Sequence, residues 1–156
     1  MYNSQMFLFK SPPKKLVGFE DMKIAIKNPA RYIIINTLPV GEQDTLIRGT
    51  LPMDREETVI NTQLNDYTSP DLPVIVYGRN SCDLSVDQKQ TQLRALGIVD
   101  VYIYAGGMFE WLLMQDAYGV DEFPTTNQGR VDILHYRAKS SFIRGNLGSP
   151  LPPPFR

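Results

Sequence analysis

The chain contains a single cysteine, Cys82, in a segment whose composition suits the binding of an anion. Residues 78–85 (GRNSCDLS) follow an apolar run and precede a stretch with helical periodicity. A loop between a strand and a helix directs successive backbone N–H groups toward one point, and the start of the helix adds partial positive charge. We therefore expect an anion-binding loop formed by Gly78, Arg79, Asn80, Ser81, Cys82 and Ser85.

Cys82 is the candidate catalytic residue, because such loops stabilise a thiolate nucleophile. Arg79 would add a cation, whereas the carboxylate of Asp83 beside the thiol would act against it. The alternative is that Cys82 is an ordinary small side chain in a loop. His135, the only histidine, could pair with Cys82 or could be a surface or packing residue. One cysteine and one histidine do not make a metal cluster, so we expect neither metal nor cofactor.

The elements that must position this loop alternate between strands and helices. Compact apolar runs predict buried strands at 32–36, 73–77 and 99–104. Apolar spacing and glycine or proline stops predict helices over 18–29, 59–67, 85–97 and 108–119. For the third of these helices, Ser85 and Gln88 predict a capping box. Residues 37–58 are expected to be a loop, and 131–136 a short strand or helix.

This alternation predicts an α/β fold with a mostly parallel central sheet and helices on both faces. The 156 residues are enough for one domain. We place it at residues 18–127, between an extended N-terminal arm (1–17) and a basic, proline-rich C-terminal extension (128–156). The extension ends in SPLPPPFR, which favours a polyproline conformation.

Charge is distributed unevenly along the chain. Residues 1–35 carry a net charge of +4, residues 36–127 carry −9 and residues 128–156 carry +4. The basic arms could cover their own acidic body or dock on a protein partner. No stretch is rich enough in Lys and Arg to favour nucleic acid. No apolar run would cross a membrane, and one unpaired cysteine suits a reducing, intracellular compartment such as the cytoplasm. The alternative location is within a virion or other large assembly.

The chain resembles the rhodanese-like superfamily, most specifically in the later part of the matching region. The resemblance rests on PVIVYGRNSCDLS, on LRALGI, and on VDVYIYAGG followed by EWL, and it extends over roughly residues 18–119. Gly97, Gly106, Gly107 and Trp111 match the family pattern of a helix ending in Leu-x-x-x-Gly and a later Gly-Gly-x-x-x-Trp. The stretches GGMFEWLLMQDAYG and FPTT also resemble a subgroup found in large DNA viruses of algae and protists. The resemblance implies a three-layer rhodanese-like fold.

The chain departs from the family at the position that matters for catalysis. The family places its nucleophilic cysteine directly after the strand, and this chain has Gly78 there. Asn36 stands where the family usually has Asp, and the histidine of the family's first-half turn is absent from residues 47–52. The resemblance therefore implies a non-catalytic module for protein binding or assembly. The alternatives are a sulfurtransferase that uses Cys82, and a module that binds a small anion without turnover.

Overall fold

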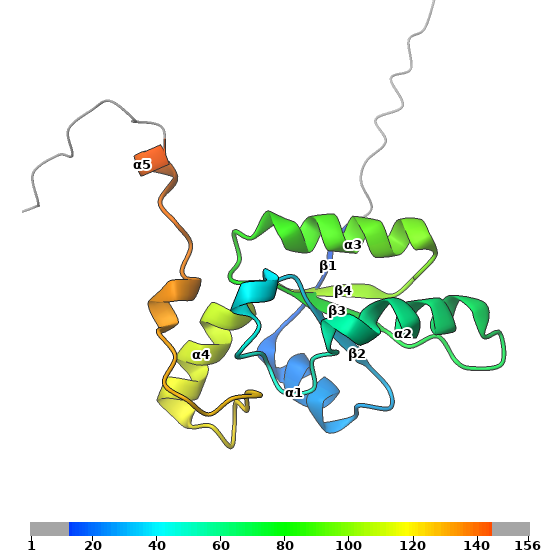
Figure 1. The fold of residues 1–156 in the computed structure, drawn as a ribbon, viewed down its shortest axis with the longest axis horizontal. Helices are drawn as coiled ribbons and strands as arrows, with labels where there is room; N and C mark the ends of the chain where they lie inside the picture. The colour runs from blue at the N-terminus through cyan, green and yellow to red at the C-terminus, as the bar shows by residue number, and fades with distance from the viewer. Residues whose placement is uncertain (1–12, 145–156) are drawn as a thin grey trace, which may run out of the picture.

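The structure, a computed structural model, describes residues 13–144 and contains a four-stranded parallel sheet in the order β1-β4-β3-β2 (Figure 1). The strands are β1 (Lys15–Val17), β2 (Ile33–Asn36), β3 (Val74–Tyr77) and β4 (Val101–Tyr104). The helices are α1 (Phe19–Lys27), α2 (Met53–Asn65), α3 (Leu84–Leu96), α4 (Gly107–Tyr118) and α5 (Ser141–Arg144). Two short 3₁₀ helices are η1 (Val40–Glu42) and η2 (Ile133–Tyr136).

Helices cover both faces of the sheet, so the predicted α/β architecture is confirmed. One core cluster joins α1 and α4 to alternate strand residues such as Ile34 and Ile75. The other cluster joins α2 and α3 to the intervening residues, such as Val74 and Val76. Successive side chains of a strand point to opposite faces of the sheet, and helices cover both faces. Runs such as VIVY are therefore buried along their whole length. Among the described residues, no helix is long and apolar enough to cross a membrane.

The structure differs from the sequence prediction in two places. Helix α2 begins at Met53, inside the segment 37–58 that we expected to be a loop. Its first turns are charged and mostly exposed, so the apolar signal begins only where Val59 and Ile60 reach the core. Residues 15–17 of the expected arm form the edge strand β1. The segment 131–136, expected to be a short strand or helix, contains the 3₁₀ helix η2, whose Tyr136 is buried. Residues 1–12 and the SPLPPPFR segment lie outside the described residues.

The side chain of Tyr77, at the end of β3, anchors a distant turn to the sheet. Its buried hydroxyl accepts a hydrogen bond from the backbone N–H of Ile47 at 3.1 Å and lies 2.8 Å from Thr50 Oγ1. Burial raises the pKa of Tyr77 above its ordinary value, so the hydroxyl stays protonated at physiological pH. The contact fixes the segment before α2 against the carboxyl edge of the sheet.

We expect Tyr77→Phe to lower the free energy of unfolding by about 1–3 kcal/mol, because it leaves the buried Ile47 N–H without its acceptor. Urea denaturation followed by circular dichroism measures this change. The matched control is Tyr67→Phe, since the Tyr67 side chain is 97% exposed. Equal stability of the two variants would contradict the role assigned to the Tyr77 hydroxyl.

Candidate functional site

The loop formed by residues 78–85 lies at the carboxyl edge of the sheet, between β3 and α3. The first free N–H groups of α4 hold its start: Met108 N donates to the carbonyl of Gly78 at 2.9 Å, and Phe109 N to that of Arg79 at 2.8 Å. The approach is so close that a Cβ on Gly107 would lie 2.5 Å from the Gly78 carbonyl oxygen. Gly107 also has a φ of +62°, so glycine is required there on two counts.

Two segments far away in sequence hold the middle of the loop. The guanidinium of Arg79 makes a two-pronged ion pair with Glu42 of η1, with Nε at 2.8 Å from Oε2. Asn80 donates its side-chain N–H to the carbonyl of Tyr136 in η2 at 2.8 Å. The sequence analysis did not identify Glu42 or Tyr136, because nothing local marks a partner 37 or 56 positions away. The Arg79 side chain, expected to receive an anion, is thus engaged with a carboxylate of its own chain.

The carboxylate of Asp83 lies inside the loop and bonds to both of its ends. Its Oδ2 accepts from the backbone N–H of Arg79 at 2.9 Å. Its Oδ1 accepts from the backbone N–H of Ser85 at 3.0 Å and from the Ser85 hydroxyl at 2.6 Å. Asp83 is therefore the N-cap of α3. The prediction that Ser85 caps this helix was wrong. Asp83 directly precedes the helix, and its side chain accepts a hydrogen bond from a free N–H group of the first turn.

The position of Gly78 has no room for a side chain. A Cβ built there would lie 2.4 Å from Oδ2 of Asp83, 2.7 Å from Cγ2 of Val86 and 2.9 Å from Oγ1 of Thr37. All three distances are shorter than a carbon atom tolerates, so a cysteine or alanine at this position requires its neighbours to move. The space where the resemblance would put a sulfur is thus filled largely by the Asp83 carboxylate.

Cys82 is exposed and is the free cysteine of the described chain. Its backbone N–H donates to Oδ1 of Asn80 at 2.9 Å, which tightens the turn between the two residues. The N–H groups of Arg79 and Ser85 point to Asp83. His135 is also exposed, and its Nε2 lies 3.7 Å from Oε1 of Glu42. Within residues 13–144, no group of three or more His, Cys, Asp or Glu side chains is arranged to hold a metal ion.

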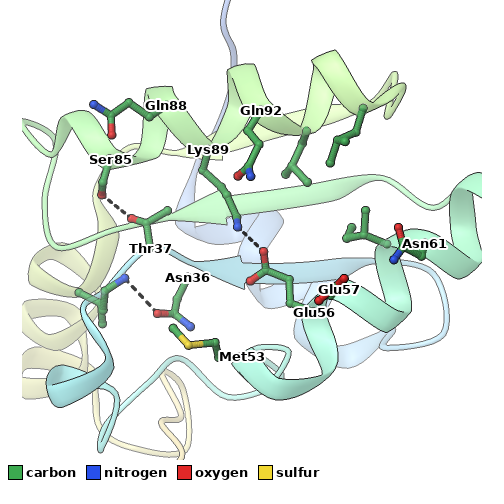
Figure 2. A pocket seen from close by; sticks show the side chains of 14 residues that line it. Asn36, Thr37, Met53, Glu56, Glu57, Asn61, Ser85, Gln88, Lys89 and Gln92 are labelled. Atoms are coloured by element: carbon green, nitrogen blue, oxygen red, sulfur yellow. Dashed lines mark hydrogen bonds and ion pairs between the residues drawn. The ribbon is translucent and has the colours of Figure 1, made fainter.

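A groove of about 710 Å³ runs between α2 and α3 and begins beside the loop (Figure 2). At that end Ser85 Oγ lies 2.7 Å from Thr37 Oγ1, and further along an ion pair joins Lys89 of α3 to Glu56 of α2. The groove is lined by Asn36, Thr37, Leu38, Met53, Glu56, Glu57, Ile60, Asn61, Ser85, Gln88, Lys89, Gln92, Leu93 and Leu96. Cys82, the single cysteine of the sequence, is not among these residues. The lining includes apolar side chains and primary amides as well as charged residues.

The sequence and the fold are both similar to known proteins. Residues 29–114, more than half of the chain, match the family model of the rhodanese-like domain. No curated protein matches the sequence. A full-length protein from Lactobacillus plantarum has a similar structure, with a TM-score of 0.52, 17% identity and coverage of 72% of this chain and 87% of that chain.

Two further solved structures share the fold. The Alr3790 protein from Anabaena sp. aligns with a TM-score of 0.51 and 21% identity, over 76% of this chain and 96% of that one. A single-domain sulfurtransferase from Saccharomyces cerevisiae aligns with a TM-score of 0.50 and 17% identity, over 70% of this chain and 98% of that one. At these identities the likeness concerns the fold alone.

We expect Gly78 and Asp83 to be coupled in a double-mutant cycle. Gly78→Ala should cost about 1–3 kcal/mol of unfolding free energy through overpacking, and Asp83→Ala about 1–2 kcal/mol through loss of the cap. Because removal of the carboxylate frees space for the new Cβ, the double variant should lose less than the sum, by at least about 0.5 kcal/mol.

The control cycle combines Gly78→Ala with Ser81→Ala, since Ser81 is exposed. Its two effects should add. Additive effects of Gly78→Ala and Asp83→Ala, measured by denaturant unfolding, would show that the carboxylate does not occupy the space beside Gly78.

Proposed function

The chain belongs to the rhodanese-like domain family, and from this premise we propose that it is a non-catalytic member that acts in protein binding or as a subunit of a larger assembly. The observation that carries the proposal is the pair of hydrogen bonds from Arg79 N–H and Ser85 N–H to the carboxylate of Asp83. In a catalytic member of the family, by the resemblance, such N–H groups would face a sulfur and its anionic substrate. In this chain they bind a carboxylate of the protein itself.

Electrostatics strengthens this argument. A negative charge brought to about 4 Å from the Asp83 carboxylate meets a repulsion of roughly 1 kcal/mol in water and roughly 4 kcal/mol near a protein surface. The cation of the loop itself, Arg79, is already paired with Glu42. A thiosulfate or phosphate ion would therefore have to displace a bonded carboxylate without the help of a free guanidinium.

The surface next to the loop supports binding of a protein. The groove between α2 and α3 has apolar side chains at its base and partly exposed ones at its rim, including Met53 and Leu96. The amides of Asn61, Gln88 and Gln92 can donate and accept hydrogen bonds, as a peptide backbone requires. The groove also carries charged side chains, namely Glu57 and the ion pair of Lys89 with Glu56. This mixture of apolar, amide and acidic groups suits a polypeptide better than a small anion.

A sulfurtransferase that uses Cys82 is the alternative, because the thiol is exposed and belongs to the same loop. A persulfide on Cys82 would lack the two N–H groups that Asp83 occupies. The two proposals differ in what they predict for sulfur transfer from thiosulfate to cyanide, a reaction that yields thiocyanate and sulfite.

We expect the wild-type chain to form no thiocyanate above the uncatalysed rate, and Cys82→Ser to behave identically. A rhodanese-like enzyme with its catalytic cysteine serves as the positive control for the assay. Thiocyanate formation by the wild type that is abolished in Cys82→Ser would refute the non-catalytic proposal and establish the sulfurtransferase.

We also expect no saturable binding of sulfate or thiosulfate to the wild type by isothermal titration calorimetry at millimolar anion concentration, because Asp83 occupies the N–H groups. Asp83→Asn is the matched variant, since it removes the charge and keeps an oxygen that can cap α3. Saturable binding to the wild type that does not differ from binding to Asp83→Asn would favour the anion-binding alternative.

A further inference from the structure

A second concave site lies beside α1, on the face of the sheet away from the groove between α2 and α3. It is a pocket of about 260 Å³ between α1 and the sheet, and it reaches from Val17 at the end of β1 to Tyr32 and Pro73, which precede β2 and β3. It shares no residue with the groove between α2 and α3. The pocket is lined by Val17, Asp21, Ile24, Tyr32, Pro73, Ile75 and Tyr102.

The lining of this pocket is aromatic and apolar, with one carboxylate. The rings of Tyr32 and Tyr102 are partly buried, and neither hydroxyl takes part in a hydrogen bond between described residues. Ile24 is 50% exposed although it faces the pocket. Asp21 is exposed at the rim, where one of its oxygens accepts the N–H of Gly18 and the other remains available. Free tyrosine hydroxyls donate hydrogen bonds to carbonyl oxygens, and a free carboxylate oxygen accepts from a cation.

A proline-rich segment with a basic residue has the complementary chemistry. Prolines offer carbonyl oxygens without N–H groups, and their fixed backbone loses little entropy when they dock on aromatic rings. Residues 149–156 of this chain, SPLPPPFR, form such a segment and lie outside the described residues. Arg156 complements Asp21 in charge. The groove between α2 and α3 is a poorer match, since no aromatic residue lines it.

The position of α5 favours a second copy as the source of the segment. The described chain ends at α5, which projects beyond η2 and α4 at the left of Figure 1, well apart from α1. Only residues 145–148 separate α5 from the segment, and four residues span at most about 14 Å. The pocket of a neighbouring copy is therefore a more accessible target than the pocket beside α1 of the same domain.

We propose that the pocket between α1 and the sheet binds residues 149–156 of a second copy of this chain, giving a head-to-tail contact. The proline rings and Phe155 would pack on Tyr32, Tyr102 and Ile24, and Arg156 would pair with Asp21. Because a head-to-tail contact leaves one pocket and one tail free, it can extend to further copies or close into a ring. This inference rests on the proposed binding function and names its partner.

The test replaces Phe155 of the 156-residue chain by the photo-crosslinker benzoylphenylalanine and mixes isotope-labelled with unlabelled copies. After irradiation, mass spectrometry should find cross-links between one copy and peptides of the other that contain Ile24, Tyr32 or Tyr102. The control places the same crosslinker at Phe142, which is 92% exposed. It should not label the pocket.

Two conservative variants sharpen the test. Asp21→Asn keeps an acceptor for Gly18 N–H but removes the charge, so the intermolecular yield should fall by up to roughly fivefold. Tyr102→Phe removes only a hydroxyl and should also lower the yield, whereas Asp116→Asn and Tyr67→Phe, at exposed sites elsewhere, should leave it unchanged.

Cross-links confined to the same copy, cross-links to other surfaces, no cross-links, or yields unaffected by Asp21→Asn and Tyr102→Phe would each overturn the inference. The thiocyanate assay tests the non-catalytic function separately. Each of the outcomes above would therefore refute the head-to-tail contact without refuting the non-catalytic function.

Discussion

The carboxylate of Asp83, held by N–H groups on both sides of the 78–85 loop, is the interaction on which the site depends. The carboxylate closes the loop between the end of β3 and the start of α3. Its occupation of the centre explains why residue 78 must lack a side chain, since a Cβ would lie 2.4 Å from Oδ2. The glycine and the aspartate therefore form one arrangement, in which an internal carboxylate occupies N–H groups at both ends of the loop. Under the proposed function, the lack of a nucleophile at residue 78 and the lack of an anion site have the same structural cause.

The rest of the fold reinforces this arrangement from a distance. Helix α4 bonds to the first carbonyls of the loop, η1 neutralises Arg79, and η2 bonds to Asn80. Each contact engages a group of the loop within its own chain. Under the proposed function, binding then falls to other surfaces of the domain. The groove between α2 and α3 and the pocket beside α1 are two such surfaces, and their linings differ in aromatic content.

The strands and most helices could be predicted from the sequence because buried parallel strands appear as continuous β-branched runs, such as Tyr32–Asn36, and because Gly97 ends α3. The start of α2 could not, since its first turns are charged and mostly exposed and carry no apolar periodicity. The Ser85 cap was wrong because two adjacent residues carry capping side chains, and only geometry separates them. Gly78 did indicate an altered site, but the position of the Asp83 carboxylate depends on backbone N–H groups that no sequence pattern displays. The roles of Glu42 and Tyr136 likewise arise from chain segments that meet only in the folded domain.

The most direct measurement of the central claim is an NMR titration with thiosulfate at neutral pH that follows the backbone amide resonances of Arg79 and Ser85. The account predicts that thiosulfate moves neither resonance in the wild type, and that Asp83→Asn shifts both, because it removes the carboxylate that accepts from both N–H groups. Amides that shift on addition of thiosulfate to the wild type but not on replacement of Asp83 would contradict it, because the N–H groups would then be open to an external anion.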